Sequence, residues 1–173
     1  EKITRALIQT QEHFERIWPR PPAGELWLAE DTAQIMSLAT FREFCVPYDR
    51  LLYDRLGGQG AGRVMHMCGQ SQHLHPALVE DLSITEFALF GFPVAPEVAA
   101  RNLGGRMMMS GNLNPMLLLN GTPEEVKAEA IECLRVLAPC GGLLLGDGAN
   151  VCPGTPLENL AAVTDAAVEV GLP

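Results

Sequence analysis

The chain has 173 residues, of which 47% are hydrophobic and 19% charged, so it has enough apolar material for a buried core and is not expected to be disordered. Twelve lysines and arginines stand against 21 aspartates and glutamates, which gives a formal net charge of −9. An acidic surface repels a phosphate backbone, and no apolar run reaches the roughly 20 residues that cross a bilayer, so we expect neither nucleic-acid nor membrane binding.

The five cysteines have no spacing typical of a disulfide framework, and the opening residues EKITRALIQTQ do not form a secretory signal. We therefore expect reduced thiols in a cytoplasmic protein. The length predicts a single α/β domain over 1–173, and the charged opening without an initiator methionine indicates a piece of a longer protein.

Apolar runs of strand length alternate with longer segments of helical period, the pattern of βα units around a parallel sheet. The N-terminal part is predicted to contain a helix over 3–18 stopped by Pro19, Pro21 and Pro22, a strand over 26–29 followed by Glu30 and Asp31, and a helix over 38–56 interrupted by Pro47. Residues 1–22 would thus be a leading helix and a proline-rich connection, and 23–173 the βα units.

The later strands are predicted at 63–68, 82–90, 106–110 and 142–145, with a helix at 95–103. Two more helices follow the pattern Thr-Pro-x-Glu, with Thr122 and Thr155 as N-caps and a proline at the first helical position. In the first of these helices Cys133 lies on the apolar stripe and is expected in the core. The second helix is expected to end at Gly171. Its core-facing stripe is expected to consist of Leu157, Leu160, Ala161, Thr164, Ala167 and Val168.

Five strands cannot close a (β/α)8 barrel, which needs eight strands and typically about 250 residues. The chain is therefore predicted either as an open sheet or as an incomplete barrel. An incomplete barrel leaves two unpaired strand edges, so such a piece would pair with a second copy or swap elements.

In parallel βα folds the ligand site lies beyond the carboxyl ends of the strands. His66 and Cys68 alternate on one face of a predicted strand, so both could reach one Zn²⁺, with Cys152 after the last strand as a third ligand. The alternative is that all three residues are ordinary lining and filler positions. His73 and His75 are predicted in a solvated loop entering a helix at Pro76.

Two strand ends are rich in glycine and polar residues, SGNLNP at 110–115 and GDGANVCPGTP at 146–156. In the second, Asp147, Gly148 and Asn150 form a turn whose backbone N–H groups could hold a carboxylate or phosphate. Asp147 is the candidate general acid or base, and Asn112 in the first segment is a candidate binding residue; structural turn chemistry is the competing explanation for the second segment.

Four motifs in this order resemble the uroporphyrinogen decarboxylase superfamily: HMCG at 66–69, GNLNP at 111–115, GTPEEV at 121–126 and GDGANVCPGTPLENL at 146–160. The resemblance runs from about Leu26 to the end and implies the C-terminal portion of a (β/α)8 TIM barrel, with about five parallel strands. FREFCVPYDRLLYDRL at 41–56 is similar to the helix before the HxCG strand of the family.

HMCG resembles the zinc-binding HxC of the corrinoid methyltransferase branch, which implies His66 and Cys68 as ligands. That branch has its third ligand, a cysteine, at the position of Ala149, and often an acidic residue where this chain has Gly91-Phe92. Cys152, three residues after Ala149, is the substitute expected here. Decarboxylases usually carry a histidine at the position of Ala149.

The first hypothesis is an enzyme, a corrinoid-dependent methyltransferase in which Zn²⁺ activates a thiol or similar acceptor and a corrinoid protein is the partner. Asp147, Gly148, Asn112 and Asn150 would orient the substrate. The alternative is a metal-free decarboxylase acting on a carboxylated tetrapyrrole. A third hypothesis, favoured for the isolated 173 residues, is an inactive structural half.

Overall fold

A computed structural model describes residues 1–19 and 24–171 of the chain. Its centre is a parallel sheet with the strand order β1-β2-β3-β4-β5, so each strand pairs with its neighbours in the sequence. The strands are β1 Glu25–Ala29, β2 Gly62–His66, β3 Glu86–Ala88, β4 Met108–Leu113 and β5 Leu143–Asp147. This sequential order, with a helical connection after each of the first four strands, is that of part of a (β/α)8 barrel, as the sequence predicted.

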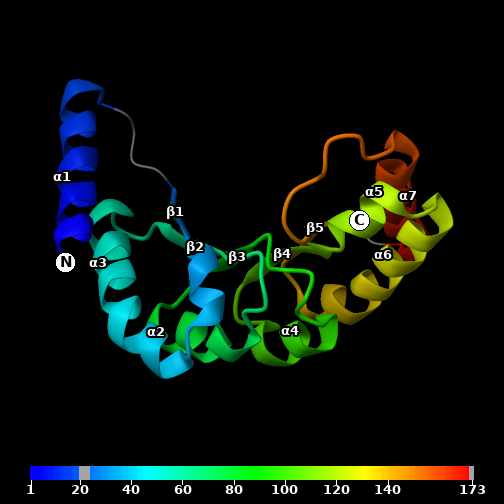
Figure 1. Ribbon diagram of the computed structural model, residues 1–173, viewed down its shortest axis with the longest axis horizontal. Helices are drawn as coiled ribbons and strands as arrows, with labels where there is room; N and C mark the ends of the chain where they lie inside the picture. Colours follow the sequence, from blue (N-terminus) through cyan, green and yellow to red (C-terminus); the bar gives the residue numbers. More distant parts are fainter. Residues whose placement is uncertain (20–23, 172–173) are drawn as a thin grey trace.

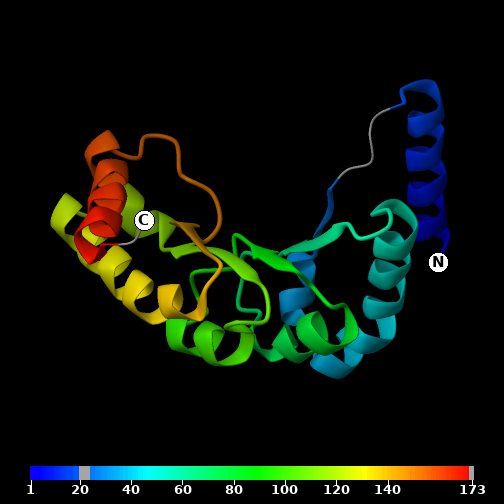
Figure 2. The ribbon, with the colours of Figure 1, turned by 180° about the vertical axis from the view of Figure 1, so that it is seen from behind.

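Helices α2, α3, α4 and α6 lie along one face of the sheet, whereas α1 stands beyond the β1 end and α5 and α7 lie beyond the β5 end (Figures 1 and 2). The α-helices are α1 Lys2–Ile17, α2 Leu38–Phe44, α3 Val46–Leu56, α4 Pro96–Leu103, α5 Pro115–Asn120, α6 Pro123–Leu137 and α7 Leu157–Val170. Short helical turns are η1 Asp31–Ile35, η2 Gln72–Leu74, η3 Ala77–Asp81 and η4 Ala138–Cys140. Among the described residues no helix combines the length and apolarity of a membrane span.

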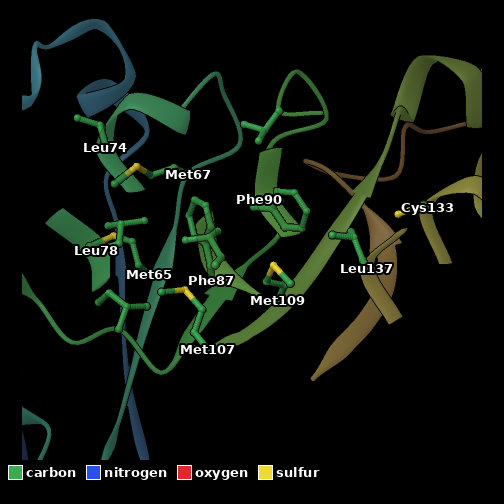
Figure 3. Packing of buried hydrophobic residues seen from close by; sticks show 14 of the residues in the cluster. Met65, Met67, Leu74, Leu78, Phe87, Phe90, Met107, Met109, Cys133 and Leu137 are labelled. Carbon is green, nitrogen blue, oxygen red and sulfur yellow. The ribbon is translucent and has the colours of Figure 1, made fainter. Parts of the chain in front are cut away.

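The core lies between the sheet and the helices that cover it. Met65, Phe87 and Met109 come from three adjacent strands and are fully buried against the helical layer (Figure 3). The opposite face of the sheet is concave, and none of the described helices covers it (Figures 1 and 2). Because neighbouring residues of a strand point to opposite faces, Trp27 and Met108 lie on this open face, and both are exposed.

The predicted N-terminal helix is confirmed as α1, but most of its large apolar side chains are exposed. Thr4 and Ile8 are the buried residues of α1, while Ile3 and Phe14 are exposed. The predicted helix over 38–56 is two helices that meet at Cys45, because Pro47 occupies the first turn of α3. Pro21 and Pro22, predicted to stop α1, lie outside the described residues.

The third and fourth strands differ from their predicted bounds. The strand predicted over 82–90 is reduced to β3, since Leu82 closes the turn η3 and Ser83 has a positive φ of 54°. The fourth strand begins two residues later and ends three later than predicted. Its motif SGNL is therefore in the strand itself, which places Asn112 inside the fold instead of in a loop.

The two C-terminal helices were predicted with the same cap, and only the first has it. Thr122 accepts the Glu125 N–H, and the Glu125 carboxylate accepts the Thr122 N–H, so the capping box of α6 is confirmed. Thr155 caps nothing: its hydroxyl donates to the Cys152 carbonyl, and Pro156 is the N-cap of α7. Cys133 is buried in the core as expected.

The predicted inward face of α7 was also wrong. Leu157 and Val168 are exposed, whereas Asn159, Ala162 and Ala166 are buried. Small residues let α7 approach α6 closely, and the Asn159 amide donates to the carbonyls of Leu118 and Gly121. The predicted end of the helix at Gly171, in the left-handed conformation, is confirmed.

Candidate metal centre

Three possible metal ligands meet where β1 and β2 end. Asp31 is the second residue after β1, His66 is the last residue of β2, and Cys68 follows two positions later. The pairing of Ala29 with His66 brings the two strand ends level. The predicted strand over 63–68 ends at His66, so Cys68 lies in the segment that follows it. One ligand atom from each of the three residues lies within 4.8 Å of those of the other two.

The imidazole of His66 is fixed by the sheet. Its Nδ1 lies 3.0 Å from the carbonyl oxygen of Ala88 in β3, so Nδ1 carries the proton and donates. The other nitrogen, Nε2, lies 3.4 Å from Asp31 Oδ1. In the neutral ring this nitrogen presents a lone pair. Metal-bound imidazole rings are commonly oriented by a backbone carbonyl in this way.

Asp31 is in turn tied to Cys68. Its Oδ1 accepts the backbone N–H of Cys68 at 3.1 Å and lies 3.3 Å from the Cys68 Sγ. Partial burial opposes ionisation of Asp31, but these bonds and the nearby His66 outweigh it and hold the pKa of the carboxyl below its ordinary value. Burial, followed by the bond to Asp31 and its negative charge, raises the pKa of the Cys68 thiol.

The donor set fits zinc. With bonds of about 2.0–2.3 Å, a tetrahedral zinc ion separates an oxygen ligand from a nitrogen or sulfur ligand by roughly 3.4–3.6 Å, close to the observed 3.4 Å and 3.3 Å. A cation would also relieve the facing lone pairs of His66 and Asp31 and stabilise the Cys68 thiolate. Three protein ligands leave a fourth position for a substrate, as in catalytic zinc sites.

A second pair of carboxyl groups lies beneath this cluster. The Glu30 backbone N–H donates to the His66 carbonyl at 3.0 Å and so continues the pairing of β1 with β2. The Glu30 side chain faces Asp49 of α3. Asp49 is almost fully buried, and burial together with the negative charge of Glu30 raises the pKa of Asp49 to about 8. Burial likewise raises the pKa of Glu30. The pair therefore holds a proton at neutral pH.

His66 also borders a cavity of about 280 Å³ on the concave face of the sheet. Its other walls are Trp27, Leu28 and Ala29 of β1, Leu89 after β3, and Ala149 and Asn150 after β5. Leu89 has a φ of 48°, unusual for this residue type, and its N–H donates to the Ser110 hydroxyl. The cavity is mainly apolar, with a polar rim from the last strand end.

The residues predicted in the final turn are only partly brought to this site. Asn150 lines the cavity, and Asp147 accepts the Ala149 N–H at 3.0 Å, which shapes the turn. The Gly148 backbone is packed so closely that an added Cβ would lie 2.5 Å from the Phe92 nitrogen. Cys152 is not part of the Asp31–His66–Cys68 group; its Sγ lies 4.0 Å from the Asn150 carbonyl oxygen.

Asn112, predicted to bind substrate, is buried beneath β4. Its amide donates to the Val94 carbonyl at 2.7 Å, and its Oδ1 lies 3.7 Å from the Cys133 Sγ. The first contact ties β4 to the loop before α4, and the second ties it to α6. Asn112 does not line the cavity beside His66.

Sequence reasoning missed Asp31 as a possible ligand. The available signal was the acidic pair Glu30–Asp31 directly after a strand, since carboxylates at that edge of a parallel sheet point toward the ligand site. What the pattern did not reveal was that the two acids separate, with Glu30 toward the helical layer and Asp31 toward His66.

The sequence model of uroporphyrinogen decarboxylase (URO-D) matches residues 23–170, most of the chain. The chain belongs to the uroporphyrinogen decarboxylase family. Both methyltransferases and decarboxylases are among the relatives of this chain, so membership of the family does not by itself decide between the two reactions.

A methylated-thiol–coenzyme M methyltransferase from Methanosarcina mazei is 32% identical over 86% of this chain and 38% of its own length. A methylcobamide:CoM methyltransferase from Methanosarcina barkeri is 31% identical over 76% of this chain and 37% of its own. A uroporphyrinogen decarboxylase from Anaeromyxobacter sp. is 27% identical over 96% of this chain and 45% of its own. The chain thus spans less than half the length of these curated relatives.

The fold of the family is also found in a solved structure, a methyltransferase from Methanosarcina mazei. It superposes with a TM-score of 0.70 over 96% of this chain and 47% of its own, at 23% sequence identity. At that identity the superposition shows the shared fold, and the incomplete barrel described above corresponds to about half of that protein.

Proposed function

We propose that this chain carries the metal-binding half of a zinc-dependent methyltransferase that passes a methyl group from a corrinoid protein to a thiol or similar acceptor. The observation that carries the proposal is the convergence of Asp31, His66 and Cys68 at the ends of β1 and β2. In place of Cys152, Asp31 is the third ligand in this proposal. The names of the two methyltransferase relatives, which mention methylated thiols, methylcobamide and coenzyme M, support the substrate classes.

In the proposed mechanism, His66, Asp31 and Cys68 would hold the metal, and the Ala88 carbonyl keeps His66 in the required tautomer. Bound zinc would supply a positive charge that lowers the pKa of an acceptor thiol and so makes a thiolate nucleophile available at neutral pH. The apolar walls from Trp27 and Leu89 would exclude water from the thiolate.

The final turn is proposed to orient the acceptor. The Asn150 amide borders the cavity and is free to bind a polar end of the substrate. Asp147 would act through the turn, because its carboxylate fixes the Ala149 N–H. Asp147 is thus proposed as a positioning residue here, and Gly148 keeps the turn close to Phe92.

Metal analysis of the purified full-length protein tests the ligand set. We expect about one zinc per chain in the wild type, loss of zinc in the His66→Ala and Asp31→Asn variants, and retention in Cys152→Ala. Asp147→Asn is the matched control for Asp31→Asn, since it removes a carboxylate charge at another strand end. Retention by Asp31→Asn together with loss in Cys152→Ala would restore the assignment from sequence and refute ours.

The same preparation separates the two activities of the family. Methyl transfer from methylcobamide to a thiol, lost in parallel with zinc, supports the proposal. A metal-free protein that decarboxylates a carboxylated tetrapyrrole would overturn it in favour of the alternative activity. For the isolated 173 residues we propose zinc binding without turnover, because the described helices leave the concave face of the sheet uncovered (Figure 1).

A further inference from the structure

A second cavity, of about 260 Å³, lies outside the candidate metal centre. It opens between the η2–η3 segment, which follows β2, and the end of α4. It shares no residue with the cavity beside His66. Its polar wall consists of Gln72, His73, His75, Glu80, Arg101, Asn102 and Arg106.

His75 was predicted in a solvated loop, but it is only 1% exposed. Its ring packs edge-on against Phe87 of the core, with 5.9 Å between the ring centroids. The Asn102 amide nitrogen lies 3.2 Å from His75 Nδ1 and donates to it, so the proton of the neutral ring is on Nε2. Among the described residues this Nε2–H has no acceptor.

The buried ring stays uncharged at neutral pH. Burial, with a smaller contribution from His73, lowers the pKa of His75 to about 4. His75 is therefore a neutral hydrogen-bond donor with an unmet need for an acceptor. A buried donor left without a partner costs free energy. A small shift of the His75 ring toward the cavity that it lines would let a ligand atom accept this proton and remove that cost.

The two arginines of the wall are also without partners. Within residues 1–19 and 24–171, neither the Arg101 nor the Arg106 guanidinium makes a hydrogen bond or ion pair. The acidic residue of the wall, Glu80, is already paired with Arg42, whose guanidinium lies 3.2 Å from the Glu80 carboxylate and 2.6 Å from that of Asp81. In a chain of net charge −9, two unpaired arginines at one cavity are an unusual concentration of free positive charge.

We propose that this cavity binds an oxyanion, the phosphate or carboxylate group of a small molecule, between Arg101 and Arg106 with His75 as a neutral donor. Guanidinium groups match both kinds of anion through paired hydrogen bonds, and a neutral imidazole N–H adds a further donor without a further charge. The cavity holds several times the roughly 30 Å³ occupied by one water molecule, so it accommodates the anion together with part of the molecule that carries it.

Thermal unfolding of the purified full-length protein with added inorganic phosphate or succinate tests the proposal. A bound oxyanion stabilises the folded state in a saturable way, so the melting temperature should rise and level off with at least one of the two. Stabilisation by phosphate identifies a phosphate-bearing ligand, and stabilisation by succinate alone identifies a carboxylate.

The Arg101→Gln and Arg106→Gln variants should each weaken the binding of that anion about tenfold, since a hydrogen bond to a charged group is worth roughly that factor. Both side chains are exposed, so folding should be retained. Arg135→Gln on α6 makes the same change at an exposed position away from the cavity and should leave binding unchanged. No saturable shift with either anion, or equal shifts in the wild type and the Arg101→Gln/Arg106→Gln double variant, would overturn the proposal. Zinc content is expected to be the same in all of these variants.

Discussion

Replacing Asp49 with asparagine should change how the stability of this protein depends on pH. Asp49 lies under the strand end that carries Asp31, and it faces Glu30 in a nearly water-free environment. Burial and the charge of Glu30 raise the pKa of Asp49 from 3.8 to about 8. An asparagine keeps the size of the side chain and can donate to Glu30 as the protonated acid does, but it has no proton to lose.

The sign follows from proton linkage. Between about pH 4 and pH 8 the folded chain keeps the Asp49 proton and the unfolded chain has released it, so rising pH favours unfolding. Because the folded chain holds one more proton, the free energy of unfolding falls by about 1.4 kcal/mol for each unit that the pH rises, or about 3 kcal/mol from pH 5 to pH 7. The stability that this proton contributes is fully present below the pKa of Asp49 in the unfolded chain. It is lost as the pH rises through the pKa of Asp49 in the folded chain. The Asp49→Asn variant should lack it and become the more stable protein toward pH 8.

Urea unfolding at pH 5, 6, 7 and 8, followed by circular dichroism, measures this difference. A chelator should be present, because zinc binding has a pH dependence of its own. Asp165→Asn makes the same substitution at an exposed position on α7 and is the matched control. Glu30, whose pKa is also raised, retains its own effect in the variant. If Asp49→Asn and the wild type lose stability in parallel between pH 5 and pH 8, the buried protonated pair does not exist.

Three further predictions concern stability and are measured by urea unfolding. Thr122→Ala removes one half of the capping box of α6 and should cost about 1 kcal/mol; Thr155→Ala, which removes no cap, should cost less, and an equal loss would contradict the cap assignment. Phe87→Ala leaves a cavity among fully buried side chains and should cost about 3–5 kcal/mol; a loss below 1 kcal/mol would mean that this part of the core is loosely packed. Leu157→Ala and Val168→Ala remove exposed side chains of α7 and should each stay within about 0.5 kcal/mol of the wild type; a larger loss would show that this face is covered in solution.

Local signals predicted the elements that local physics determines. The Thr-Pro-Glu-Glu cap located α6 because each hydrogen bond of that motif is made within four residues. Alternation along the predicted strand over 63–68 placed His66 and Cys68 together, and the two are close in the structure although β2 ends at His66. The superfamily resemblance is confirmed by the match over 23–170 and supplied the fold class that five strands alone left open.

The errors come from contacts between distant residues. The buried face of α7 depends on the distant carbonyls that Asn159 binds, so apolar spacing within the helix pointed to the wrong side. His75 is buried by Phe87 and bound by Asn102, 27 positions along the chain. The role of Asp31 required the register between β1 and β2, which no motif within either strand specifies.

Trp27 gives the protein an intrinsic optical reporter. Its indole is half exposed on the cavity wall shared with His66, and its N–H donates to Glu25 at 2.7 Å. Tryptophan emission shifts in wavelength when water leaves the ring, so occupation of that wall can be followed by fluorescence without any label. The sequence holds one other tryptophan, Trp18. In a Trp18→Phe variant the tryptophan emission therefore comes from Trp27 alone and reports ligand binding at the concave face of the sheet.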